Sequence, residues 1–271
     1  MDRQSILAKP WSTIDDPEIK GLVAFTFLEE RKIALWLARD YYRGEGEIID
    51  GGAFFGGSAL SLAAGLRVNA VVPDGQKGSR IHVFDNFTWD SWINKKHLPD
   101  DVRFGTSFLN IFHDTVRKYE DLLIIHPGNI EQRSWRHGPI ELLFVDCAKS
   151  FTANAAIMEL FFPHLIPGRS IVNQQDYAIV SRLIWLHASM EYFWDKFEEL
   201  GIGMSGGTSL FRLIEPITAE DVQSCIAALR TGCLDLAERA MYRYEPGDRR
   251  RNCIRKSIEG YNRQPLPIPA E

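Results

Sequence analysis

The chain has 271 residues, 45% of them hydrophobic and 25% charged, which suits one large domain or one domain with helical extensions. A formal net charge of -5 argues against a nucleic acid or an anionic membrane as the main partner. The N-terminus lacks the apolar core of a secretion signal, and no apolar run approaches the roughly 20 residues of a membrane span. We therefore expect a cytoplasmic protein.

Residues 1–45 precede the first apolar strand and are expected to form a helical cap. Asp16-Pro17-Glu18 is a favourable helix start, because acids and proline suit the first turn. Gly44 and Gly46 end the helical pattern. A segment in this position is expected to cover the sheet or a cofactor site.

A glycine-rich turn follows the first strand. The apolar run ends at Asp50, passes four glycines between positions 51 and 57, and opens a helix over 58–66 that begins at Ser58. A strand, a tight turn and a helix N-terminus commonly hold a nucleotide-like cofactor. Glycine is needed where a ligand approaches the backbone. The alternative is a glycine-rich turn without a ligand.

The remaining core alternates strands and helices. This pattern, with nearly all-apolar strands, predicts an α/β fold: a doubly wound, mostly parallel seven-stranded sheet with N- and C-terminal helical extensions. The last two strands are expected to add an antiparallel edge. Further strands are expected over 80–85, 122–125, 141–146, 169–173, 201–204 and 208–214, and helices over 106–120, 152–165 and 178–200.

The chain beyond the sheet is expected to be helical again. Thr218-Ala219-Glu220-Asp221 is a capping-type helix start, and residues 237–244 suggest a second helix. We interpret Arg249-Arg250-Arg251 as a solvated run beside a turn, and the tail after 264 as loose. The predicted division is a helical cap (1–45), a core (46–216) and a C-terminal extension (217–271).

Polar side chains stand at the ends of five strands. They are Asp50, Asp85, Asn129, Asp146 and Asp176. One acid at a strand end is explained by helix capping. Because ligands of such sheets bind at the carboxyl ends of the strands, acids at four ends predict a binding crevice.

The glycine spacing distinguishes between cofactors. A dinucleotide fold requires G-x-G-x-x-G, whereas this turn has the form D-x-G-x-x-x-G-x-S. Over residues 46–215 the sequence resembles the class I S-adenosylmethionine-dependent methyltransferases. The resemblance implies the Rossmann-like methyltransferase fold and S-adenosylmethionine as the cofactor. The cofactor-binding residues it implies are Asp50, Gly52, Phe54, Gly56, Ser58, Asp85, Asn129 and Asp146.

Roles within that set follow from the same resemblance. Gly52 and Gly56 would line the methionine part of the cofactor, and Asp85 would accept hydrogen bonds from the ribose hydroxyls. Asn129-Ile130 would flank the adenine. A carboxylate suits a vicinal diol because it can accept from both hydroxyl groups at once.

The residues that follow the fourth and fifth predicted strands resemble those of one subclass of these methyltransferases. The D-x-x-K pattern of Asp146 and Lys149, with Gln175-Asp176-Tyr177 after the next strand, is similar to small-molecule O-methyltransferases. The related types are the catechol and caffeoyl-CoA enzymes and the macrocin (macrolide-sugar) enzymes. The resemblance implies that Asp146 and Lys149 are catalytic, with Lys149 as the base. It also implies Asp146, Gln175 and Asp176 as ligands of a divalent metal such as Mg²⁺.

Two positions depart from that pattern. Gln175 stands where the family has a carboxylate, and Cys147 lies inside the motif. An amide oxygen is a weaker Mg²⁺ ligand, so a metal-bound and a metal-free site both stay open. Without metal, Lys149 or a histidine must accept the proton, and Lys149 requires a lowered pKa to do so. The alternative for Lys149 is a surface ion pair with Asp146.

The other candidate residues are weaker indications of a functional site. His126, His164 and His187 are expected on separate elements as structural or solvated residues. The stretch 87–92 could wall an acceptor pocket, and Trp185 and Trp194 are expected to pack a helix on the sheet.

The sequence favours S-adenosylmethionine-dependent methyl transfer to an oxygen of a small-molecule acceptor. Such an acceptor would carry a sugar or phenolic hydroxyl group, in a natural product or a polysaccharide. The alternative is a catalytically degenerate fold that binds a ligand or a partner. The glycine spacing disfavours an NAD-dependent oxidoreductase. No nucleic acid or membrane partner is expected, and a homodimer stays open.

Overall fold

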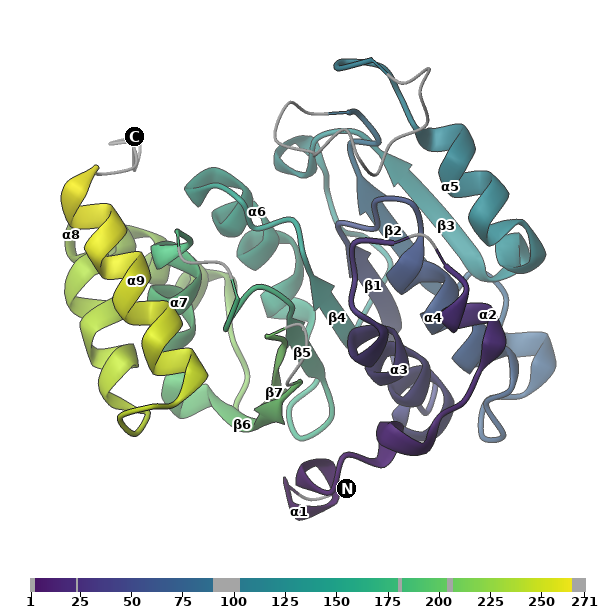
Figure 1. The fold of residues 1–271 in the computed structure, drawn as a ribbon, viewed down its shortest axis with the longest axis horizontal. Coiled ribbons are helices and arrows are strands. Elements are labelled where there is room, and N and C mark those ends of the chain that lie inside the picture. Colours follow the sequence, from purple (N-terminus) through teal and green to yellow (C-terminus); the bar gives the residue numbers. More distant parts are fainter. Residues whose placement is uncertain (1–2, 23, 90–102, 180–181, 204–206, 265–271) are drawn as a thin grey trace.

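A seven-stranded sheet in the order β3-β2-β1-β4-β5-β7-β6 lies between two layers of helices (Figure 1). The computed structural model describes residues 3–22, 24–89, 103–179, 182–203 and 207–264. The strands are β1 (Glu47–Gly51), β2 (Ile81–Asp85), β3 (Leu123–Pro127), β4 (Ile140–Val145), β5 (Ile171–Gln174), β6 (Phe197–Ile202) and β7 (Ser209–Leu213). The α-helices are α1 (Arg3–Leu7), α2 (Pro17–Lys20), α3 (Leu28–Trp36), α4 (Gly57–Arg67), α5 (Leu109–Val116), α6 (Phe151–Phe161), α7 (Ile184–Tyr192), α8 (Ala219–Tyr242) and α9 (Arg249–Arg263).

The first five strands are parallel, and β7 runs antiparallel to both β5 and β6. The predicted doubly wound, mostly parallel sheet with an antiparallel edge is therefore confirmed. The strand order reverses between β1 and β4, which are neighbours. In open α/β sheets a ligand crevice forms outside the carboxyl ends of the strands at such a point.

Both faces of the sheet are buried, which explains why its strands are apolar at successive positions. Ile48 packs in the core with α3, α4 and α5, whereas the next residue, Ile49, packs in the core with α6, α7, α8 and α9. Figure 1 shows these two groups of helices on opposite sides of the strands. Because side chains alternate along a strand, each strand supplies both cores.

The N-terminal helix α3 packs directly on α4. A Cβ at Gly65 would lie 2.3 Å from the carbonyl oxygen of Leu35, so this close approach requires glycine. Arg31 of α3 donates hydrogen bonds to the carbonyl oxygens of Ile19 and Leu22, at 2.5 and 3.2 Å. These contacts hold the segment before α3 against the helix.

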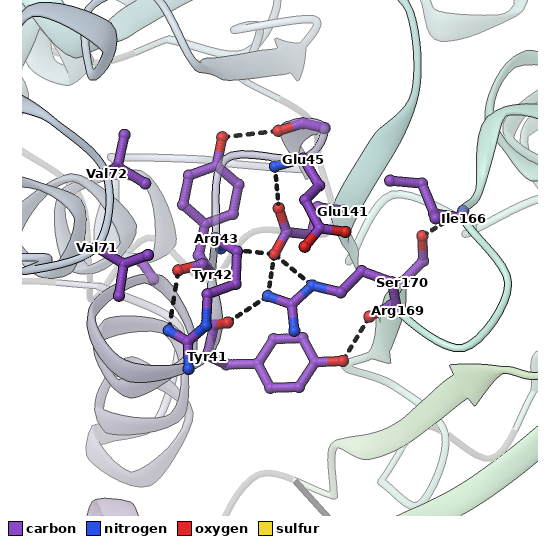
Figure 2. A network of polar contacts seen from close by, with 12 residues as sticks. Tyr41, Tyr42, Arg43, Glu45, Val71, Val72, Glu141, Ile166, Arg169 and Ser170 are labelled. Carbon is purple, nitrogen blue, oxygen red and sulfur yellow. Dashed lines mark hydrogen bonds and ion pairs between the residues drawn. The ribbon is translucent and has the colours of Figure 1, made fainter.

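A buried carboxylate fastens the chain between α3 and β1 to the sheet (Figure 2). Glu141, at the start of β4, is 0% exposed and accepts hydrogen bonds from the backbone N–H groups of Arg43 and Glu45, at 2.7 and 2.8 Å. Arg169 forms an ion pair with the same carboxylate. This network lies at the amino ends of β4 and β5, away from the crevice.

The predicted helix over 178–200 is wrong at both ends. Helix α7 begins at Ile184 and ends at Tyr192, a 3₁₀ turn covers Trp194–Lys196, and strand β6 begins at Phe197 rather than at 201. Pairing with β7 supplies hydrogen bonds to this segment, and Phe197 and Leu200 are buried. Long-range pairing overrides the local helical pattern here.

Two other predicted helices are shorter than expected. The helix predicted over 106–120 is α5 (Leu109–Val116) followed by a 3₁₀ stretch, Arg117–Leu122. The helix predicted over 152–165 ends at Phe161, where Phe162–His164 continues as a 3₁₀ turn with proline inside it. Proline cannot donate the next helical hydrogen bond, so the helix ends there.

The C-terminal extension differs most from its prediction. Helix α8 covers 219–242 and is kinked at Gly232, whose backbone is not helical, so two helical segments follow one another here as predicted, with the break earlier than residue 237. The prediction of a solvated arginine run is wrong, because it forms the first turn of α9. Arg250 is only 16% exposed in its side chain and forms an ion pair at 2.7 Å with Glu199 of β6. This pair attaches α9 to the sheet edge.

None of the helices in the described ranges combines the length and the apolar composition that a bilayer crossing requires. The division of the chain at residues 45 and 216 stays a prediction.

Candidate functional site at the carboxyl ends of the strands

A cavity of about 660 Å³ lies where the strand order reverses. Its walls come from the turns after β1, β2, β3, β4 and β5, and from the start of α3. This volume is typical of small-molecule pockets. The predicted site residues that line it are Gly52, Phe54, Asp85, Asn129, Asp146, Lys149, Gln175 and Asp176.

Two glycines in the turn after β1 are required because other parts of the chain pack closely against them. Gly52 has φ +97°, and a Cβ there would lie 2.8 Å from the backbone of Asp146. Gly56 has φ +94°, and a Cβ there would meet side chains of α5, 3.0 Å from Val116. Among the described residues, Gly52 lines the cavity and Gly56 does not. The ligand-approach explanation therefore does not fit Gly56.

Asp50 and Ser58 lie beneath the turn rather than in the cavity wall. Ser58 Oγ donates a hydrogen bond to Asp50 Oδ2 at 2.9 Å, and both residues are buried. Burial raises the pKa of Asp50 to about 7, although the Ser58 hydrogen bond opposes this shift. In this arrangement the pair supports the turn from inside.

The Asp85 carboxylate is held in place by two backbone amides. Phe54 N–H donates to Oδ2 at 2.8 Å, and Phe87 N–H donates to Oδ1 at 2.7 Å. Burial raises the pKa of Asp85, while these hydrogen bonds lower it. A carboxylate has about four acceptor positions, so lone pairs remain available for a ligand.

Aromatic side chains surround this part of the cavity. The Phe54 ring lies 4.6 Å from that of Phe25 and 5.2 Å from that of Phe108, and all three residues line the cavity. In the predicted acceptor wall over 87–92, Thr88 lines the cavity, whereas Phe87 and Trp89 are buried and do not line it. Residues 90–92 lie outside the described residues. The aromatic lining therefore comes from Phe25, Phe54 and Phe108 rather than from Phe87 and Trp89.

The turn after β3 contributes Asn129 and Ile130 to the cavity. The Asn129 side chain accepts a hydrogen bond from the backbone N–H of Glu131 at 3.0 Å and so caps a short 3₁₀ turn. This bond fixes the turn that the resemblance associates with adenine.

Lys149 lies between two carboxylates in the part of the cavity wall that the turns after β4 and β5 form. Its Nζ is 2.6 Å from Asp146 Oδ1 and also forms an ion pair with Asp176 Oδ2. Burial alone would lower the pKa of Lys149, but the two carboxylates outweigh burial and raise it well above its usual range. Burial, with Asp146 nearby, raises the pKa of Asp176 to about 6.

This charge state does not fit the base role predicted for Lys149, because a protonated ammonium group has no lone pair to accept a proton. The structure instead favours the alternative ion pair with Asp146, extended to a second acid.

The donor set also does not fit Mg²⁺. The ammonium group of Lys149 already lies between the two carboxylates that would hold the ion, and the remaining predicted ligand is the amide of Gln175. Burial raises the pKa of the Cys147 thiol well above its usual range, so it remains a neutral thiol. Mg²⁺ requires charged oxygen ligands, which here are already neutralised.

Glu30 is a cavity residue that the sequence did not single out. It comes from α3, is 6% exposed, and accepts hydrogen bonds from Phe27 N–H at 2.8 Å and from Thr208 Oγ1 at 2.9 Å. Burial raises its pKa to about 7, and the charges of Asp146 and Asp176 add to this shift. Its position three residues after Phe27 marks a helix start, but only the tertiary structure brings it to the strand ends.

Two of the predicted lone histidines, His187 and His126, have different surroundings. His187 is buried with Nε2 2.8 Å from the carbonyl oxygen of Tyr177, as expected of a structural residue. His126 is not isolated, because its ring stands beside those of His82 and His137. Trp185 packs as predicted and donates its indole N–H to the carbonyl oxygen of Ala148 at 3.0 Å.

No protein-family model matches this chain. No curated protein matches it either. Among solved structures it is similar to the calicheamicin methyltransferase CalS11, with 18% identity, a TM-score of 0.48, and coverage of 78% of this chain and 91% of that chain. It is also similar to an O-methyltransferase from Bacillus cereus in complex with SAH, with 13% identity, a TM-score of 0.45, and coverage of 78% and 96%.

A third similar structure is cofactor-bound Rv0187 from MTB, with 14% identity, a TM-score of 0.47, and coverage of 79% and 99%.

Proposed function

We propose that this protein is an S-adenosylmethionine-dependent methyltransferase that acts on a hydroxyl group of a small molecule. One observation carries the proposal. The Asp85 carboxylate, fixed by two backbone amides, faces a cavity at the point where the strand order reverses. A fixed acceptor of this kind suits the diol of a ribose.

The cofactor lies, in this proposal, across the turns after β1, β2 and β3. Asp85 accepts hydrogen bonds from the two ribose hydroxyls, and Asn129 and Ile130 flank the adenine. The backbone of Gly52 and Phe54 faces the methionine part. Gly56, Asp50 and Ser58 hold the shape of the turn without contacting the cofactor.

The acceptor enters beside the start of α3. Phe25 and Phe27 line the cavity there and are 42% and 46% exposed. Exposed aromatic side chains at a cavity mouth bind flat apolar rings well. This composition supports a phenolic acceptor over a bare sugar.

S-adenosylmethionine, when bound, supplies an electrophilic methyl group on a sulfonium sulfur. The acceptor oxygen must lose its proton as its bond to the methyl carbon forms and the carbon–sulfur bond breaks. Glu30 is the proposed proton acceptor, because a carboxylate with a pKa near 7 is matched to this task at neutral pH. Lys149 stays protonated and holds Asp146 and Asp176 in place.

Cofactor binding is the first test. Isothermal titration of the full chain with S-adenosylmethionine is expected to give one site, and titration with NAD none. Asp85→Ala is expected to weaken the binding about 10- to 100-fold, because it removes charge-assisted hydrogen bonds. Asp74→Ala, at an exposed position far from the cavity, is the matched control and is expected to keep wild-type affinity.

Methyl transfer is then measured with a labelled cofactor and panels of phenols and sugars. Absence of cofactor binding would contradict the proposal. Binding without transfer to any acceptor would favour the degenerate, ligand-binding alternative.

A further inference from the structure

Three histidines that are far apart in the sequence meet on the α6 side of the sheet. His82 belongs to β2, His126 to β3, and His137 to the loop before β4. One ring nitrogen from each lies within 4.8 Å of the others. His82 is 1% exposed, His126 is half-buried and His137 is exposed, so the cluster is accessible from one side.

Aromatic neighbours hold the rings of His82 and His126. The His126 ring stacks on Phe84 with centroids 4.3 Å apart and planes at 6°. The His82 ring lies edge-on to Trp135 at 4.8 Å. These contacts orient the nitrogens of His82 and His126 toward each other, with Nδ1 and Nε2 3.0 Å apart.

A carboxylate with 14% side-chain exposure, that of Glu47, stands on the far side of His82. Glu47 Oε2 lies 3.6 Å from His82 Nε2, and it is a buried oxygen for which the described residues supply no hydrogen-bond partner. The other oxygen of Glu47 accepts from Arg80 Nη1 at 3.0 Å. A carboxylate behind one nitrogen of a histidine places the proton there and leaves the lone pair on the other nitrogen, as in metal sites.

We propose that His82, His126 and His137 bind a zinc ion, with Glu47 as the orienting carboxylate. Three neutral imidazoles suit Zn²⁺ and do not suit Mg²⁺ or Ca²⁺. Zinc–nitrogen bonds of about 2.0–2.1 Å place tetrahedral ligand nitrogens about 3.3 Å apart, a spacing close to that of His82 and His126. The exposed His137 completes the set by a side-chain movement, and the fourth position faces solvent.

In the metal-free protein, His126 Nε2–H donates a hydrogen bond to His82 Nδ1. When zinc binds it takes the place of this proton, and the His126 ring carries its proton on Nδ1 instead. The ion would join β2, β3 and the loop before β4. The site shares Phe84 with the cavity and is separate from the proposed chemistry, so its test does not depend on methyl transfer.

The experiment is competition for zinc between untagged full-length protein and a chromophoric chelator. The wild type is expected to take up one zinc ion per chain and to show a raised melting temperature, whereas MgCl₂ leaves both readings unchanged. His137→Gln, at an exposed position that tolerates substitution, is expected to abolish this uptake, as is His126→Asn. Glu47→Gln is expected to weaken it about 10- to 100-fold.

His113→Gln is the matched control, because His113 is exposed and pairs with Glu120 outside the cluster. It is expected to retain the zinc uptake. X-ray absorption of the zinc-loaded wild type is expected to show nitrogen and oxygen ligands with an imidazole signature. Equal uptake by the wild type and His137→Gln, or sulfur in the ligand shell, would overturn the proposal.

Discussion

Among the described residues, no cation pairs with Asp50 to compensate for its burial. Its side chain lies under the glycine turn with one hydrogen bond from Ser58. Burial raises its pKa to about 7, while the unfolded chain keeps the ordinary value near 4. The carboxyl group is therefore protonated in the folded state and ionised in the unfolded state between these two pH values. Its stabilising effect is complete at low pH and is lost as the pH rises through 7.

Asp50→Asn is expected to make the protein more stable than the wild type at pH 8, by on the order of 2–4 kcal/mol. The amide keeps an acceptor for Ser58 and carries no charge. At pH 4 the two proteins are expected to unfold at the same urea concentration. Asp114→Asn, at an exposed site, is the control and is expected to have little effect at either pH. A lower stability of Asp50→Asn at pH 8 would contradict this explanation.

Opposite charges set the direction of the pKa shift of Lys149, whereas burial sets that of Glu30. Both residues line the cavity, but Lys149 has two acids as neighbours and Glu30 has two hydrogen-bond donors and two distant like charges. Neighbouring charges of opposite sign keep the lysine protonated. Burial raises the pKa of Glu30 to about 7, so near physiological pH a large share of its carboxyl groups is protonated.

At the scale of elements, the Glu141 network connects three parts of the chain (Figure 2). Its carboxylate binds two backbone amides before β1 and the guanidinium group of Arg169, which also lies 4.1 Å from the Tyr41 ring. The segment that carries α3 is therefore fixed to β4 and β5. Since Glu30 belongs to α3, this anchor contributes to the geometry of the cavity.

Glu141→Gln is expected to lower the free energy of unfolding by about 3 kcal/mol, because one partner of a buried ion pair is removed. Urea denaturation measures this change. Asp121→Asn is the control: it breaks an ion pair with Arg67 whose side chains are 44% and 59% exposed. Exposed pairs contribute less than about 1 kcal/mol. Equal losses in the two variants would show that burial of the network is not what stabilises this end of the sheet.

At the scale of the whole molecule, the fold brings the start of helix α3 to the carboxyl ends of strands that follow it in the sequence. The cavity thus combines strand-end acids with a buried glutamate from the N-terminal segment. Thr208, after β6, donates to the same glutamate. Distant parts of the chain together set the pKa of Glu30.

If Glu30 accepts the proton, kcat is expected to rise with pH through about 7 and then to level off, because only the ionised carboxylate can act. Glu30→Gln is expected to lower kcat about 10²- to 10⁴-fold with little change in cofactor affinity. Glu29→Gln, the neighbouring residue outside the cavity lining, is the control and is expected to keep the wild-type rate.

The same pH profile is expected with EDTA present, because Lys149 lies where a metal ion would bind. Loss of turnover on chelation, restored by Mg²⁺, would contradict the metal-free site. A pH profile that does not change in Glu30→Gln would remove this residue from the proton transfer.

The sequence by itself determined the alternation of strands and helices, the parallel sheet with its reversed edge, and the strand ends that meet at the crevice. These features depend on local patterns: apolar runs, glycines with positive φ, and acids at the ends of strands. The roles of Asp85 and Asn129 in cofactor binding stay predictions, although both residues line the cavity.

Only the tertiary structure decided how the charged groups meet. It places Lys149 between Asp146 and Asp176, brings Glu30 into the cavity, gathers three histidines from separate elements, and pairs Phe197–Ile202 with β7 instead of extending α7. The physical reason is that a pKa, an ion pair or a strand pairing depends on neighbours distant in sequence and on burial. No local sequence pattern specifies these distant neighbours or the burial of a side chain.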